Sequence, residues 1–258
     1  MHVTVQIIKS IIVSSFFVVL SAWAVPACAE TVSYQLYMTL GPVSVRTGKA
    51  KLDITPVTYR GQRAVHSRLA MQTGSGADVV FTLRDTVQSY YTSSGRSLYY
   101  SKTVNEGSRH NFEEAVFDNR NGLFTVELST WDKLSDKRLE HAEKSSPQRI
   151  FDMLSLLDYA RGIKTGSLVK GREIAVLPMV NGAMVVDQHL IYEGRVNVKT
   201  GTGLRKDCLK VSVRDWKYGS ERETLVIYAD PNDGNLPVRL DIVLGGAALS
   251  ARLSDYSK

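Results

Sequence analysis

The chain has 258 residues, with 32 lysines and arginines against 26 aspartates and glutamates, so its formal net charge is +6. The positive charge is spread along the chain, without a run of five like charges or an arginine-rich arm, which argues against a nucleic-acid partner. A chain of this length can bury one large hydrophobic core.

The first thirty residues have the order of a secretory signal. A weakly basic stretch at 2–9 precedes the apolar segment 11–20, and the small-residue tripeptide 27–29 follows. The apolar run is short for a bilayer span. We predict a signal peptide at residues 1–29, cleavage after Ala29, a periplasmic location in the cell envelope, and no transmembrane span once the signal is removed.

Two alternatives to a free periplasmic form stay open. Cys28 would become an acylated N-terminus in a lipoprotein, although Pro26 stands where such a signal normally has a small or hydroxylated residue. The protein could also be surface-exposed. After cleavage at Ala29 only Cys208 remains as a thiol, so we expect no intramolecular disulfide.

From residue 31 onward, apolar and polar residues alternate with a period of two, which is typical of half-buried β-strands. In 32–40, the residues Val32, Tyr34 and Leu36 share one face with Met38 and Leu40. The same alternation returns at 79–87, 123–128, 207–213 and 236–244.

Turn dipeptides separate these strands, and Asn-Gly and Asp-Gly favour the positive φ angles of tight hairpins. The dipeptides are Arg60-Gly61, Ser94-Gly95, Asn121-Gly122, Asn181-Gly182 and Asp233-Gly234. We therefore predict an all-β, mainly antiparallel fold: a large curved sheet, arranged as a sandwich or an open barrel, with one main helix packed against it.

The segment 147–161 is the predicted helix. Ser146 suits its N-cap, Pro147 its first position and Gly162 a left-handed stop. An apolar stripe would pack on the sheet: Ile150, Met153, Leu154 and Leu157. No linker-like composition flanks the helix, so we predict a single β-rich domain at 30–258, with halves at roughly 31–145 and 163–258.

The second half of the chain resembles a known family. The matching segments are 152–161, 174–182, 207–213 and 236–256. They are similar to the uncharacterised bacterial family catalogued as domain of unknown function 3108. The resemblance covers nearly the whole mature chain and implies an exported, β-rich envelope protein. It assigns no catalytic residue, because the family has no agreed activity.

We find no motif for catalysis, metal binding or a cofactor. The five histidines are dispersed, and neither His-Glu-x-x-His nor paired Cys-x-x-Cys occurs. Cys208 has no neighbouring histidine in the sequence and fits a small buried residue. We therefore predict no catalytic residues, no metal site and no cofactor.

Asp85 stands out because alternation places it on an apolar strand face with Leu83 and Val87. A carboxylate there requires a cation or a set of donors, since an unpaired buried charge is costly. We expect either a buried ion pair with an arginine from a neighbouring strand, or a ligand-binding or catalytic acid in a wet cavity.

Tyrosines crowd the first half of the chain: Tyr34, Tyr37, Tyr90, Tyr91, Tyr99 and Tyr100. Their flat faces and polar tips suit sugar rings or lipid boundaries, and tyrosine is equally common in plain sheet packing. As candidate ligand-binding residues we take Asp85, Tyr34, Tyr90, Tyr99 and Leu157.

Three functions remain in view. The first is a non-catalytic binding or carrier module, whose sheet and helix enclose a lipid or lipid-linked glycan. The second is an envelope glycan hydrolase with paired carboxylates, Asp85 with Glu113 or Glu114. The third is a structural partner of an outer-membrane protein complex, which would present a sheet edge or an apolar patch.

Overall fold

The computed structural model describes residues 29–41, 43–74, 82–106, 109–217, 220–243 and 247–258. Apart from Ala29, the predicted signal peptide lies outside the described residues, and so does the 79–81 part of the strand predicted at 79–87.

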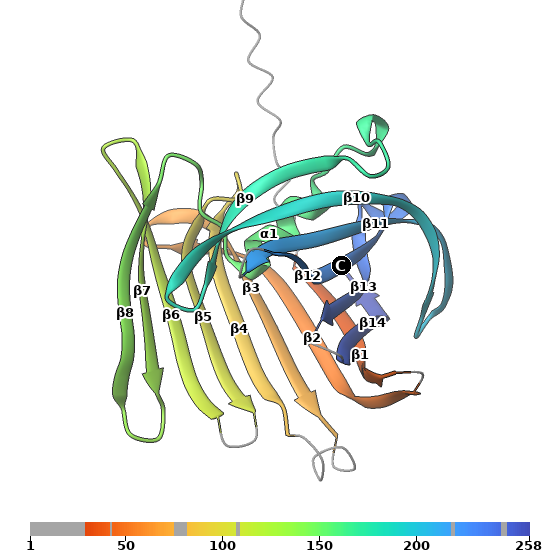
Figure 1. Ribbon diagram of the computed structural model, residues 1–258, viewed down its shortest axis with the longest axis horizontal. Helices are drawn as coiled ribbons and strands as arrows, with labels where there is room; N and C mark the ends of the chain where they lie inside the picture. The colour runs from red at the N-terminus through yellow and green to blue at the C-terminus, as the bar shows by residue number, and fades with distance from the viewer. Residues whose placement is uncertain (1–28, 42, 75–81, 107–108, 218–219, 244–246) are drawn as a thin grey trace, which may run out of the picture.

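Fourteen antiparallel strands form one sheet in the described residues (Figure 1). In chain order the first eight strands are β1 Glu30–Leu40, β2 Val43–Tyr59, β3 Gln62–Thr73, β4 Arg84–Thr92, β5 Ser97–Glu106, β6 Arg109–Arg120, β7 Leu123–Asp132 and β8 Lys137–Ser146. The other six are β9 Glu173–Asn181, β10 Met184–Thr200, β11 Gly203–Lys217, β12 Ser220–Asp230, β13 Leu236–Val243 and β14 Ala247–Ser257. One α-helix, α1, spans Met153–Arg161, and the short 3₁₀ turns η1 and η2 span Thr165–Ser167 and Pro231–Asp233. The predicted fold class is confirmed.

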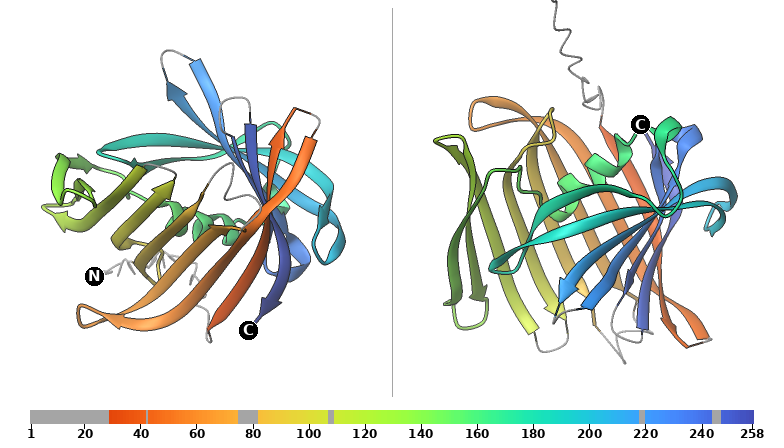
Figure 2. Two further views of the ribbon diagram at one scale, coloured as in Figure 1. Left: turned by 90° about the horizontal axis from the view of Figure 1, so that it is seen from below. Right: turned by 45° about the horizontal axis from the view of Figure 1, so that its top comes forward.

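The sheet curls into a nearly closed barrel with α1 inside its curve (Figure 2). Its strand order is β8-β7-β6-β5-β4-β3-β2-β1-β14-β13-β12-β11-β10-β9, so the first and last strands pair in the middle. The edges are β8 and β9, and β8 lies next to β10. The chain passes from one edge to the other through α1.

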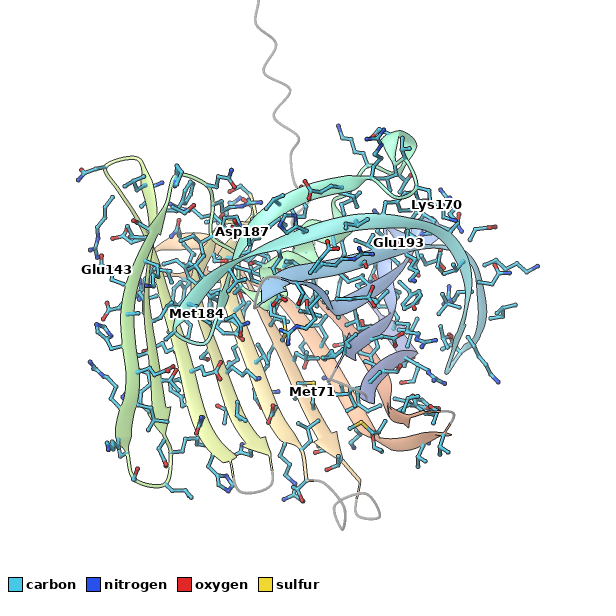
Figure 3. All side chains as sticks on the ribbon, in the orientation of Figure 1. Met71, Glu143, Lys170, Met184, Asp187 and Glu193 are labelled. Carbon is cyan, nitrogen blue, oxygen red and sulfur yellow. The ribbon has the colours of Figure 1, made fainter. Side chains whose placement is uncertain are left out.

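The two edges are protected in different ways. On the β9 edge, the Phe151 amide donates to the Pro178 carbonyl at 2.7 Å, and the Val180 amide donates to the Phe151 carbonyl at 2.9 Å. The β8 edge is rich in charged residues, among them Glu143 (Figure 3), whose carboxylate pairs with Arg120 at 3.5 Å. Charged side chains on an edge strand discourage pairing with a second sheet.

The period-two pattern sets the inner face as predicted. Val32, Tyr34 and Leu36 are each 1% exposed and line the concave side of β1. The partner of Leu36 on β2 is Gly48, where an added Cβ would lie 2.1 Å from the Gln72 carbonyl oxygen. Strands β2 and β3 approach so closely there that only glycine fits.

Two of the five predicted turns have positive φ at both residues of the dipeptide, whereas in Ser94-Gly95, Asn181-Gly182 and Asp233-Gly234 only the glycine does. Arg60 and Gly61 have φ angles of 49° and 77°, and Asn121 and Gly122 have φ angles of 54° and 80°. Two successive positive φ angles match the twist of the flanking strands. These turns therefore fix the register of β2 with β3 and of β6 with β7.

The predicted helix boundaries are partly wrong. The helix ends near Arg161 as expected, but it begins at Met153, and the segment from Pro147 to Phe151 is not helical. The N-cap is Asp152, whose carboxylate accepts from the Leu154 and Ser155 amides. A buried capping box outcompetes the half-buried Ser146 and the exposed Pro147, because it also satisfies the first turn of the helix.

The C-terminal end also differs from the prediction. Gly162 has a φ of −78°, which is right-handed rather than left-handed. The side-chain amide of Asn235 donates to the carbonyls of Arg161 and Ile163 at 2.8 and 3.0 Å. The carbonyl of the last helical residue, Arg161, therefore finds a side-chain donor without a left-handed turn.

Asp152 also fastens the helix to the sheet. Its Oδ2 accepts hydrogen bonds from the hydroxyls of Ser97 on β5 at 2.6 Å and Ser89 on β4 at 2.9 Å. Burial raises the pKa of Asp152, and the hydrogen bonds from Ser97, Ser89 and Ser155 partly oppose that rise. Both carboxylate oxygens are thus occupied by donors from three elements.

Removing this carboxylate should cost considerable stability. We expect Asp152→Ala to lower the free energy of unfolding by about 2–4 kcal/mol, because it removes the helix cap and an acceptor of the buried Ser89 and Ser97 hydroxyls. Urea unfolding would measure the loss. Asp255→Ala, at an exposed position on β14, is the matched control and should change stability by less than about 0.5 kcal/mol. Equal stability of the two variants would contradict this role.

Candidate functional site

The curved sheet and α1 enclose a cavity of about 470 Å³. Most of its lining is apolar and comes from both halves of the sheet and from the helix. Met71, labelled in Figure 3, belongs to this lining, together with Leu36, Leu69, Met153, Leu156 and Leu240. We call this space the main cavity. It exists because α1 covers only part of the concave face.

The inner face changes from apolar to polar along one row of cross-strand neighbours. Leu52 pairs with Leu69, Leu69 with Val87, and Val87 with Lys102. The next neighbour after Lys102 is Glu113 on β6. The row therefore places an apolar surface and two charged groups side by side on one wall.

Polar side chains also enter the main cavity from β11 and β12. The Arg222 guanidinium lies 3.3 Å from Oδ2 of Asp215, whose side chain is 5% exposed. Among the described residues, Oδ1 of Asp215 has no hydrogen-bond partner. Thr224 and the buried Gln188 line the same part of the wall. The cavity therefore combines an apolar majority with a few polar groups.

Three of the five candidate residues meet in the main cavity: Tyr34, Asp85 and Leu157. The Tyr34 hydroxyl donates to the Pro237 carbonyl at 2.9 Å, and burial raises its pKa. Asp85 is 2% exposed, and its Oδ1 accepts from the Asn105 amide at 2.8 Å. A backbone donor on β5 thus supplies one of the partners that this buried carboxylate requires.

The other two candidates, Tyr90 and Tyr99, lie on the outer face of the sheet. The Tyr90 ring is stacked between the rings of Tyr59 and His66, at centroid distances of 4.3 and 4.4 Å. Tyr99 meets Tyr90 edge-on at 6.1 Å. Because neighbouring rings cover the faces of Tyr90, this cluster packs like ordinary cross-strand pairs. The sheet separates it from the main cavity.

A second cavity of about 130 Å³ adjoins the first, and we call it the side cavity. Tyr100 and Glu113 line it, and Lys102, Met153, Met179 and Asn181 line both cavities. Burial raises the pKa of Tyr100, and the charges of Glu113, Asp152 and Asp85 add to that rise. A second group of polar side chains in the lumen therefore lies around Tyr100 and Lys102, apart from Asp215 and Arg222.

The carboxylates proposed for a hydrolase do not share one cavity. Asp85 lines the main cavity, whereas Glu113 and Glu114 line the side cavity. Glu114 lies beside Tyr99, where burial and then the Glu114 carboxylate raise the pKa of Tyr99 to about 12. Lys102 lies between the first two on the same wall.

Sequence reasoning missed Lys102, Asp215 and Arg222. The segment 98–104 carried a usable signal for Lys102, because Leu98, Tyr100 and Val104 alternate on its face. A lysine on an apolar strand face is as unusual as the aspartate at position 85. Asp215 and Arg222 had no such signal, since their meeting depends on how β11 pairs with β12.

Cys208 is fully buried, as predicted for a small core residue. Burial raises the pKa of its thiol to about 11, so the thiol stays protonated at neutral pH. Within the described part of the chain, no group of three or more His, Cys, Asp and Glu side chains is arranged to hold a metal ion. No helix in that part of the chain is long and apolar enough to cross a membrane.

A charged cluster surrounds the end of α1. Arg161 Nη2 lies 3.0 Å from Glu30 Oε2, and both side chains are largely buried. Burial raises the pKa of Asp158 to about 6, Arg161 partly opposes that rise, and Glu30 adds to it. Asp158 is therefore held in a site that favours its protonated form.

This shift gives a pH-dependent stability. The folded pKa of about 6 exceeds the ordinary value of 3.8, so the contribution of Asp158 to stability is full below pH 3.8 and falls until about pH 6. Asp158→Asn avoids that loss. Thermal melts should show the variant gaining about 1–2 kcal/mol over wild type between pH 4 and pH 7. A difference that does not change with pH would contradict the assignment.

Comparisons with known proteins agree with the fold. A family model described as "Protein of unknown function (DUF3108)" matches residues 33–250. A solved structure from Brucella abortus, a β-barrel-like protein of domain of unknown function DUF1849, superposes with a TM-score of 0.60 at 9% identity. The match covers 91% of this chain and 99% of that one, and at such low identity it shows the fold alone. No curated protein matches significantly.

Proposed function

The chain belongs to the DUF3108 family, and on that premise we propose that it is an exported envelope protein that binds or carries an apolar or amphiphilic molecule in its barrel. The ligand class is a lipid or a lipid-linked glycan. The observation that carries this proposal is the main cavity between α1 and the concave face of the sheet.

The size and lining of the main cavity support binding of a small molecule. Its volume of about 470 Å³ falls in the usual range of ligand sites, about 300–1,000 Å³. Such sites are mostly apolar with a few polar groups that set orientation. The apolar lining would contribute the free energy of binding, and residues such as Lys102 and Arg222 would orient the polar end.

The arrangement of the carboxylates favours binding over hydrolysis. A glycosidase of the common kind needs two carboxyl groups flanking one bond in one cleft. Asp85 and Glu113 line different cavities, and Asp85 is already bonded to a backbone amide. We therefore propose a non-catalytic role.

Filling the main cavity tests this proposal. Met71 lines the cavity, and its neighbour Gln72 is exposed on the opposite face of β3. We expect Met71→Trp to reduce several-fold the amount of lipid that copurifies from the native envelope, as measured by mass spectrometry of solvent extracts. Gln72→Trp, the matched control, should keep the wild-type load.

Folding must be checked alongside, because overpacking can destabilise a core. Circular dichroism and the melting temperature of both variants serve this purpose. A folded Met71→Trp protein with a full ligand load would show that the ligand does not bind in the main cavity. A wild-type protein that neither copurifies with nor binds any apolar molecule would contradict the proposed function.

Export is a separate part of the proposal. Strand β1 begins at Glu30, the residue that would become the first after cleavage at Ala29. Glu30 also forms an ion pair with Arg161 of α1, so the first residue of the predicted mature chain contacts the helix. We expect intact-mass analysis of the protein from the periplasm to give a chain that starts at Glu30. A diacylated chain that starts at Cys28 would instead establish a lipoprotein.

A further inference from the structure

Lys102 occupies an unusual place for a cation. It lies on the inner face of β5, between Tyr100, which is 8% exposed, and Val104, which is fully buried. Its cross-strand neighbour on β4, Val87, is also fully buried. The ammonium group therefore extends from an apolar stretch of the wall toward the lumen.

No described residue pairs with this ammonium group. Glu113 is its direct cross-strand neighbour on β6, and Asp85 lies on the same wall, yet Lys102 forms no ion pair or hydrogen bond with a described residue. Directly opposed residues have Cβ atoms only about 4.5–5.5 Å apart, so a Lys102–Glu113 pair would be sterically simple. Because the pair does not form, the ammonium is available to the lumen.

The position of Lys102 between the two cavities suggests how an amphiphile would be oriented in the lumen. Lys102, Met153, Met179 and Asn181 line both the main cavity and the side cavity, so they form the junction between the two. On the main-cavity side of the junction most of the lining is apolar, and on the other side it contains Tyr100 and Glu113. An amphiphile would place its head at the junction and its chain in the main cavity.

We infer that Lys102 binds the anionic head group of a single-chain amphiphile, a carboxylate or a phosphate, while the acyl chain fills the main cavity. This inference rests on the proposed function and adds the charge class of the ligand and its orientation. The ammonium would donate charge-assisted hydrogen bonds to the head-group oxygens.

Two acidic groups on the same wall, Asp85 and Glu113, would repel a bound anion. Whether Lys102 outweighs them depends on how close each group lies to the anion. Asp85 and Glu113 both have partners of their own, and neither is within ion-pair distance of Lys102. A head group in direct contact with the ammonium interacts more strongly with it than with carboxylates farther away. The competing explanation is that Lys102 only balances these two charges at a distance.

The experiment compares three oleoyl probes that differ in the head group: oleate, monooleoyl phosphatidic acid and neutral monoolein. Their dissociation constants are measured with wild type and with Lys102→Met, which keeps an unbranched side chain but removes the charged amino group. Lys51→Met is the matched control, because it removes the same charge from a half-exposed side chain paired with Asp53 at 2.8 Å.

We expect Lys102→Met to weaken binding of the anionic probes by about tenfold or more, which is the usual effect of losing a hydrogen bond to a charged group. Binding of monoolein should change by less than about threefold, as expected where no such bond is lost. Lys51→Met should leave all three dissociation constants unchanged. A preference for oleate over the phosphate probe, or the reverse, identifies the head group. Lys102→Gln serves as a second variant if Lys102→Met does not fold.

Two results would overturn the inference while leaving the proposed function intact. In the first, wild type binds monoolein as tightly as the anionic probes. In the second, Lys102→Met weakens all three probes equally, as a purely structural lysine would. Failure of the proposed function is distinct, because then no oleoyl probe binds to wild type.

Discussion

A single buried carboxylate, Asp152, holds the helix inside the curved sheet, and the lumen depends on it. Its oxygens accept from two helix amides and from Ser89 and Ser97 on neighbouring strands. The two helix amides and the Ser89 hydroxyl would otherwise lose this buried acceptor, which is costly in the interior. The same residue therefore starts α1 and fixes its position against β4 and β5.

The cavity follows from that position. In the described part of the chain the sheet has fourteen strands, and the nine-residue helix α1 is too short to cover the whole concave face. Ordinary cores are close-packed, with few voids larger than a water molecule, so a cavity of about 470 Å³ is a feature that packing alone does not require. Retaining it has a cost in stability, and the cost is understandable if a ligand fills the space.

Charged side chains occupy only a few places in the lumen, and in the proposed function they would orient the ligand. The apolar lining from Leu69, Met71 and Leu156 offers contact area to an apolar group, and the hydrophobic effect does not fix the orientation of that group. Lys102 on one wall and the Asp215–Arg222 pair on another are the charged groups that would orient a polar head group. The outer face instead carries the stacked rings of Tyr59, Tyr90 and His66. The two faces of the same strands therefore differ in kind: the inner face lines the cavity and the outer face carries packed aromatic rings.

The sequence by itself determined the fold class, the antiparallel hairpins and the burial of Tyr34 and Asp85, because a period of two and positive-φ turns are local properties. It did not determine whether Tyr90 and Tyr99 lie on the concave or the outer face of the sheet. Alternation assigns residues to two faces without saying which of the two faces is enclosed. The helix start at Asp152 was decided by Ser89 and Ser97, which are 63 and 55 residues away. Lys102 and the Asp215–Arg222 pair line one cavity only because the sheet curls and brings its two halves to face each other across the lumen.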